Sequence, residues 1–176
     1  MTLPQDGSPA TVPEIDRQDP GRIGDDRSML EAWLDYYRAS LLLKCSGLTA
    51  EQLVVRSCEP SPLSLAGLIR HMTEMERAYA HRLADRATPL LYCTDDDPDG
   101  DIESVTAEQA MADVQVLIDH AARSREIMAR HQLDDTFGAN WTYSLRWSYH
   151  YLIKEYARHL GHADLLRERI DGVTGE

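Results

Sequence analysis

The sequence predicts an all-α fold in which four long amphipathic helices form a bundle, and three observations support this prediction. Apolar residues recur every three or four positions along four long stretches, a spacing that gathers them on one face of an α-helix. Residues that favour helix ends flank these stretches. No stretch shows the strict alternation of apolar and polar residues typical of a half-buried strand. Because each helix has an apolar face to bury, the four helices need one another.

The first predicted helix begins at Asp26 and ends near Gly47. Its apolar face consists of Leu30, Trp33, Leu34, Tyr37, Leu41 and Leu48. Thr49 and Gln52 then match a capping box, in which a threonine hydroxyl and a glutamine side chain bond free amide groups at a helix start. They predict a short helical turn, which nearby prolines close.

The second predicted helix follows a Ser64 cap and ends near Leu83. Its apolar face consists of Leu65, Leu68, Met72, Met75 and Tyr79. The next segment holds six acidic residues between Asp95 and Glu103, and their spacing does not match a calcium-binding loop. We expect a long, solvated crossover, which permits an up-down-down-up bundle rather than a simple meander.

The third predicted helix covers residues 106–128, and the fourth covers about 144–170. Thr106 and Gln109 match a second capping box, at the start of the third helix. Gly172 follows the fourth helix and predicts its end, because glycine tolerates the left-handed conformation that terminates many helices.

Residues 1–25 are expected to form a flexible N-terminal tail outside the bundle. They contain four prolines and three glycines and show no hydrophobic periodicity. Such a tail is disordered, or it orders only by docking on another surface. Residues 26–176 are expected to form one bundle domain.

The composition indicates a soluble globular protein, with 43% hydrophobic and 27% charged residues. No apolar run reaches the length of a membrane span, and the N-terminus lacks the features of a secretory signal, so we expect a cytoplasmic protein without membrane contact. The net charge of −12 argues against nucleic acid as a partner. Three scattered cysteines, Cys45, Cys58 and Cys93, suit a reducing compartment and form no CxxC metal pair.

Three ionisable residues break the apolar pattern on the buried faces. Counting 100° per residue from Leu152, His159 lies about 20° and Glu155 about 60° from the centre of the fourth helix's apolar stripe. His71 lies about 60° from Leu68 on the second helix. All three side chains are therefore expected to lean toward the bundle interior.

Two interpretations of this cluster remain open on spacing alone. Glu155 and His159 can form an ordinary structural pair four residues apart, with His71 filling space nearby. Alternatively, the three residues hold a metal, because bundle interiors build metal sites from facing helices.

The other histidines and the aromatic residues are less informative. His162, about 80° from the stripe centre, is expected either to contact a ligand residue or to lie at the surface. No role is assigned to the four histidines expected at outward or helix-end positions, which are His81, His120, His131 and His150. Aromatic residues at helical spacing either line a pocket or pack in the core, and they are Trp33, Tyr37, Tyr79, Trp141 and Trp147.

Two stretches carry a resemblance to a known family. Residues 155–172, EYARHLGHADLLRERIDG, resemble the closing helix of the DinB-like superfamily, in its actinobacterial mini-circle-protein branch. Residues 61–71, SPLSLAGLIRH, resemble the second helix of that branch, and residues 30–53 resemble its first. The resemblance covers about residues 27–172.

The resemblance implies a metal site. In the superfamily, a histidine on the second helix and two ligands one turn apart on the last helix hold a divalent metal, commonly as three histidines. These positions correspond to His71, Glu155 and His159, and the glutamate resembles the variant found in mycothiol-dependent maleylpyruvate isomerase. Such a ligand set favours zinc and also accepts nickel, manganese or iron.

The resemblance also implies a function, although no catalytic residue follows from it. Relatives use the metal to activate a low-molecular-weight thiol, mycothiol in actinobacteria, for S-transfer to a small electrophile or for isomerisation. The alternative is a non-enzymatic, metal-containing binding or stress-response protein. An enzyme requires access to the metal, whereas a binding module predicts a covered one. A homodimer is also expected, since bundles of this superfamily often pair through a helix face and Leu42 and Leu43 are apolar.

Overall fold

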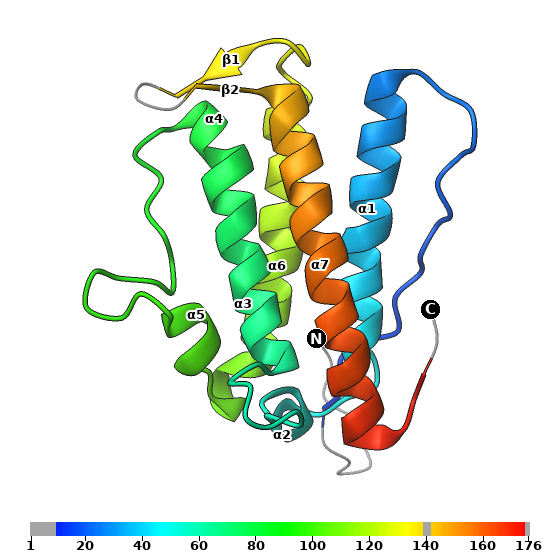
Figure 1. Cartoon of the computed structure of the whole chain (residues 1–176), viewed down its shortest axis with the longest axis vertical. Helices are drawn as coiled ribbons and strands as arrows, with labels where there is room; N and C mark the ends of the chain where they lie inside the picture. Colours follow the sequence, from blue (N-terminus) through cyan, green and yellow to red (C-terminus); the bar gives the residue numbers. More distant parts are fainter. Residues whose placement is uncertain (1–9, 139–141, 175–176) are drawn as a thin grey trace.

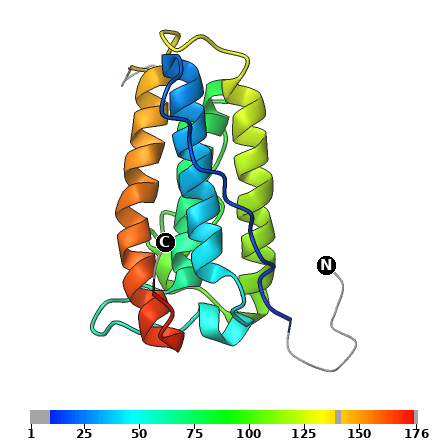
Figure 2. The same ribbon diagram turned by 90° about the vertical axis from the view of Figure 1, so that its right-hand side faces the viewer.

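The computed structural model describes residues 10–138 and 142–174, and it confirms the all-α bundle (Figures 1 and 2). The long helices are α1 (Asp26–Cys45), α3 (Leu65–Glu76), α6 (Ala107–Met128) and α7 (Leu145–Asp171). A π-helical turn, η1 (Arg77–His81), and α4 (Arg82–Ala84) extend α3. The short elements are α2 (Ala50–Leu53), α5 (Gly100–Glu103), β1 (Thr136–Phe137) and β2 (Tyr143–Ser144).

The helices run in up-down-down-up order, as predicted. In Figure 1, α1 and α7 run from the top of the bundle to the bottom, and α3 and α6 run upward. The connection between α3 and α6 returns along the outside of α3. Helix α7 packs against both α1 and α3. Because α7 runs downward and α3 runs upward, the seam between them joins two antiparallel helices.

Most of the predicted helix ends are confirmed. The Ser64 hydroxyl accepts a hydrogen bond from the Gly67 amide, and Thr49 forms its capping box with Gln52. Gly172 ends α7 with a φ of 78°. The capping box at Thr106 was wrong: its hydroxyl makes no cap bond to an amide and lies 3.3 Å from Gln109 Oε1.

The short β1–β2 hairpin was not predicted. Its two strands pair antiparallel above the ends of the helices (Figure 1). Two residues per strand are too few to show an alternating pattern, so periodicity gives no signal for them.

The N-terminal segment is docked on the bundle from residue 10 onward. It runs beside α1 in Figure 2, and the Val12 side chain is buried. The Val12 amide donates to the Leu48 carbonyl, and the Gly47 amide donates to the Val12 carbonyl. Docking is therefore the state that this part of the tail adopts.

The acidic crossover is anchored rather than wholly solvated. Glu74 Oε1 accepts the backbone amides of Leu91, Tyr92 and Cys93 at 2.6, 2.5 and 3.2 Å. Gly100 is buried in α5, where a Cβ would lie 2.5 Å from the Tyr92 carbonyl oxygen. The expected loop therefore contains a short helix with an inward side, and Asp101 is buried on it. None of the helices in the described residues has a stretch long and apolar enough to cross a membrane.

The core contains a charged pair that the sequence did not predict. The Arg38 guanidinium donates two hydrogen bonds to Glu76, Nε to Oε1 and Nη2 to Oε2, both at 2.8 Å. The Tyr156 hydroxyl donates to the same carboxylate at 3.0 Å. Burial alone would raise the pKa of Glu76, but the Arg38 charge holds it below its usual value. These contacts link α1, α3 and α7.

Replacing Arg38 with methionine should destabilise the protein by about 3–5 kcal/mol, because Glu76 would be left as an uncompensated buried charge. Asp35 forms ion pairs with both Arg38 and the exposed Arg125. The matched control is therefore Arg125→Met, which removes only the exposed pair. That change should cost less than about 1 kcal/mol. Urea unfolding measures both, and equal losses would contradict a structural role for the buried pair.

Candidate metal centre

The structure brings the three predicted ligand residues together at the seam between α3 and α7. One possible ligand atom from each of His71, Glu155 and His159 lies within 4.8 Å of the others. The imidazole rings of His71 and His159 have centroids 4.6 Å apart. Glu155 and His159 project from the same side of α7 because they lie one turn apart, and α3 packs against that side.

The cluster lies at the edge of the core and is partly open to solvent. Glu155 is 7% exposed, so its carboxylate faces inward as the helical count predicted. The side chains of His71 and His159 are 23% and 13% exposed. This partial exposure is expected of a site that is open to a small molecule, and not of a site that the fold covers.

Each imidazole is oriented by a contact on the side away from the cluster. His71 Nδ1 lies 2.8 Å from Asp101 Oδ2, and His159 Nδ1 lies 3.3 Å from His162 Nδ1. A proton on each Nδ1 leaves both Nε2 atoms free to donate a lone pair. Such outer contacts fix the tautomer and ring orientation of metal-binding histidines. His162 thus contacts a candidate ligand residue, which is one of its two expected placements.

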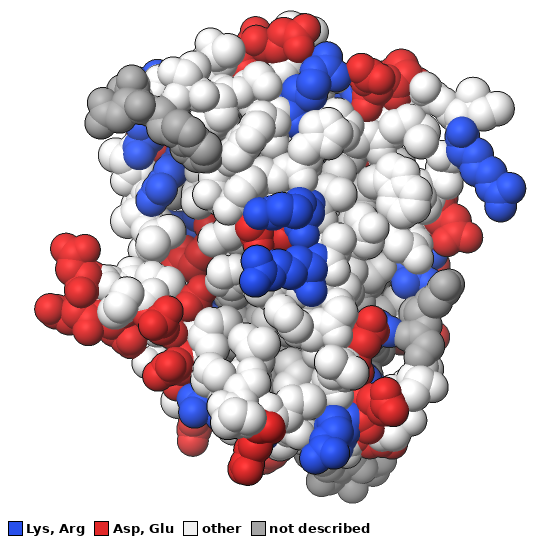
Figure 3. Space-filling view, in the orientation of Figure 1, with Lys and Arg blue, Asp and Glu red and all other residues white. Residues whose placement is uncertain are grey.

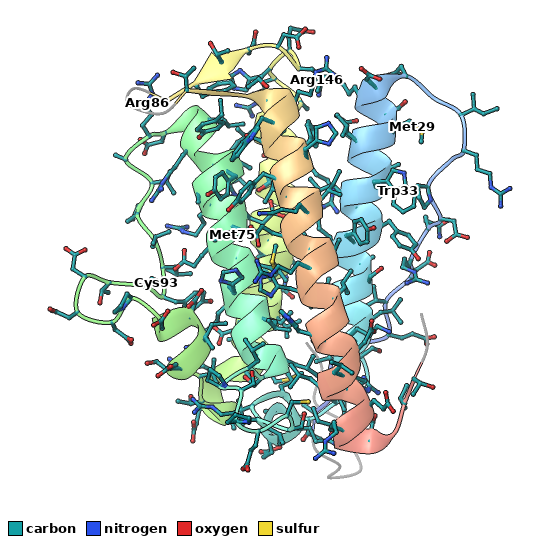
Figure 4. All side chains as sticks on the ribbon, in the orientation of Figure 1. Met29, Trp33, Met75, Arg86, Cys93 and Arg146 are labelled. Atoms are coloured by element: carbon teal, nitrogen blue, oxygen red, sulfur yellow. The ribbon has the colours of Figure 1, made fainter. Side chains whose placement is uncertain are left out.

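Sequence reasoning missed Asp101. It is one of the six acidic residues of the crossover, and nothing in the spacing shows which carboxylate turns inward. The available signal was Gly100, since a glycine beside acidic residues can mark a close backbone approach. In Figure 4 the crossover passes beside α3, where Cys93 is labelled, and α5 follows below it.

The protonation states suit a cation. Burial, together with the nearby His71 and His162, lowers the pKa of His159 to about 4. Burial would raise the pKa of Glu155, but hydrogen bonds from Lys154 and Tyr151 hold it below its usual value. At neutral pH the cluster therefore offers a neutral imidazole and an ionised carboxylate, the forms that bind metals.

The geometry favours the metal interpretation over the structural pair. His159 Nε2 and Glu155 Oε2 are 3.6 Å apart, which is too long for a hydrogen bond. Glu155 Oε1 instead contacts Lys154 Nζ at 2.5 Å. Two nitrogen donors and one carboxylate oxygen match a three-ligand catalytic zinc set, which leaves a coordination position for substrate.

One histidine expected at an outward or helix-end position lies inside the fold. His81 is buried, and its Nε2 lies 3.0 Å from the carbonyl oxygen of His120. The cause is η1, because a π-helical turn inserts an extra residue and shifts the faces of the helix after it. His150 is exposed, as predicted.

Aromatic residues form a strip along the same seam, above the cluster. Tyr79 lies 4.2 Å from Tyr151 between ring centroids, and Trp147 stacks on Tyr151 at 4.7 Å. We call these three residues the aromatic strip. The sequence pointed to Tyr79 and Trp147 but missed Tyr151. Trp33 is exposed on α1, and Trp141 lies outside the described residues.

Comparison with known families gives a match. A family model described as mycothiol-S-transferase matches residues 29–172. The matched region contains α1 from residue 29 onward, the whole of α3, α6 and α7, and the three clustered residues. No individual curated protein matches the chain significantly.

Asp101→Asn should weaken zinc binding by about 10- to 100-fold, because an amide holds the His71 imidazole less firmly than a carboxylate does. The matched control is Asp95→Asn, an exposed position in the same crossover. Competition with a chromogenic chelator measures both affinities. If the two variants bind zinc equally well, Asp101 does not position His71.

Proposed function

The chain belongs to the mycothiol-S-transferase family, and we propose that it activates mycothiol at a divalent metal and transfers the mycothiol sulfur to a small electrophile. The proposed ligands are His71, Glu155 and His159. The observation that carries the proposal is their convergence from two helices at a partly exposed position. Family membership supports mycothiol as the thiol.

The metal would act as a Lewis acid that lowers the pKa of the bound thiol. A free thiol has a pKa near 8.5 and is mostly protonated at neutral pH, whereas a metal-bound thiol is deprotonated. In the transfer, the sulfur forms a bond to carbon. Either a leaving group departs with its electron pair, or the π electrons of a conjugated double bond move away from that carbon and the product takes a proton from water. The thiol proton passes to solvent.

The protein's own residues prepare this chemistry. Glu155 contributes one negative charge, and the two imidazoles contribute none, so a divalent metal would keep a net positive charge toward a thiolate. Asp101 and His162 hold the imidazole rings. Zinc is the first candidate, and nickel, manganese or iron also suit nitrogen and carboxylate donors.

We also propose a cytoplasmic location and a homodimer. Cys45, Cys58 and Cys93 are all free thiols, which suits a reducing compartment. Leu42 packs partly against the core, so the apolar face that α1 offers a second copy is smaller than the sequence alone indicates. Sedimentation at micromolar concentration tests the dimer.

His159→Ala should abolish metal binding and mycothiol-dependent transfer while the helical content stays largely unchanged. Two remaining donors compete poorly with water, whereas α7 is held by its buried apolar face. The matched control is His150→Ala, an exposed histidine on the same helix. Metal analysis, circular dichroism and a conjugation assay with 1-chloro-2,4-dinitrobenzene and mycothiol measure the three properties.

The contrary outcome is clear. If the wild-type protein binds no divalent metal after reconstitution at neutral pH, the proposed activating centre is absent, and the non-enzymatic binding protein becomes the better interpretation. In cobalt-substituted protein, a charge-transfer band on addition of mycothiol would show that its sulfur reaches the metal.

A further inference from the structure

The aromatic strip continues directly from the metal ligands along both helices of the seam. On α7, Trp147, Tyr151 and Glu155 follow one another at intervals of four residues, which places them on one side of the helix. On the facing helix, Met75, labelled in Figure 4, lies one turn from His71 and one turn from Tyr79. The strip therefore begins about 6 Å along α7 from the position of Glu155, which is the rise of four helical residues.

Core packing does not account for the whole strip. All three of its residues are half-buried, and among the described residues Tyr79 packs against the hydrophobic core while Trp147 and Tyr151 pack on each other. The Trp147 and Tyr151 rings stack with an interplanar angle of 24°. A stacked pair beside a reactive centre offers a planar ligand a surface of matching shape.

Positive charge lies at the end of the strip nearest the metal ligands. Lys154 Nζ is 3.8 Å from the Tyr151 ring centroid and 2.5 Å from Glu155 Oε1. Figure 3 shows basic side chains with acidic atoms between them near the centre of the face viewed. Acidic residues gather instead on the crossover at the left, so this cationic position contrasts with the net charge of −12.

We propose that the aromatic strip binds the electrophile and selects planar, electron-poor aromatic or conjugated compounds. This inference rests on the proposed function. Tyrosine and tryptophan rings carry electron-rich faces, which attract the electron-poor rings and conjugated carbonyl groups that make such compounds electrophilic. Tyr151 lies one turn from Glu155 on α7, so a ligand bound at the strip lies next to the metal ligands.

The transfer step balances for this substrate class. The thiolate sulfur forms a bond to the electrophilic carbon, and the π electrons of that carbon move onto a carbonyl or nitro oxygen. A halide then departs with its electron pair, or the oxygen takes a proton from water. Lys154 brings a positive charge to the end of the strip where this negative charge develops, which lowers the energy of the intermediate.

Binding of an unreactive probe tests the strip separately from catalysis. Equilibrium dialysis of the zinc-loaded protein with 1,3-dinitrobenzene, without thiol, should show binding that Trp147→Leu weakens by about three- to tenfold. The matched control is Trp33→Leu on α1, which should bind as the wild type does. Circular dichroism and urea unfolding check that both variants fold.

A kinetic comparison adds a readout of selectivity. With mycothiol, Trp147→Leu should lower kcat/KM for 1-chloro-2,4-dinitrobenzene more than kcat/KM for iodoacetamide, which has no ring. The inference is overturned if the wild type does not bind 1,3-dinitrobenzene, if Trp33→Leu weakens binding as much as Trp147→Leu, or if both kcat/KM values fall equally. If dinitrobenzene binds at the strip but no mycothiol transfer occurs, the strip stands and the proposed function fails.

Discussion

The site depends on the hydrogen bonds that one buried carboxylate accepts, that of Glu76. It accepts hydrogen bonds from Arg38 on α1 and from Tyr156 on α7, so one side chain of α3 fixes three helices. Tyr156 is adjacent in sequence to Glu155. A buried charge is tolerated only when its partners are well placed, because an unpaired one is costly. We infer that this contact sets the register of α3 against α7, and with it the meeting of His71 with the two ligands on α7.

A second set of buried charges on α3 positions the crossover. At one end of the connection, the Glu74 carboxylate accepts hydrogen bonds from three backbone amides. At the other end, Arg70 donates hydrogen bonds to the Ser104 carbonyl and to Asp113 on α6. Between these two anchors lies α5, which carries Asp101. The long connection therefore contributes to the proposed metal centre, because it supplies the carboxylate that contacts His71.

The sequence predicted the elements that depend on periodicity. The stripe of α7 was confirmed, and the same count placed Glu155 and His159 on its inner side. The sequence could not predict which polar side chains pair with one another across the helices. Arg38 and Glu76 look like surface residues until their helices pack. At Thr106 no side-chain cap forms, and Gln109 Oε1 accepts hydrogen bonds from Arg70 and from the Thr106 hydroxyl.

Local geometry explains the remaining differences. The π-helical turn η1 holds one extra residue, which changes the side chains that face the core there. No residue type in 77–81 predicts such a turn. Asp101 was indistinguishable from its acidic neighbours because a loop has no period from which to read direction. The aromatic strip was half predicted, since Tyr79 and Trp147 stood out, while Tyr151 was passed over although it lies one turn from Glu155.

The glutamate at position 155 does more than replace a histidine. A carboxylate has two oxygens: Oε2 faces His159, and Oε1 contacts Lys154. A metal-bound imidazole at this position would present an N–H group to Lys154, and two donors do not attract each other. The second carboxylate oxygen therefore holds Lys154 where its ammonium group also lies over the Tyr151 ring. Glu155 thus connects the proposed metal centre, the positive charge of Lys154 and the aromatic strip, so the proposed choice of this ligand and the proposed choice of electrophile are coupled.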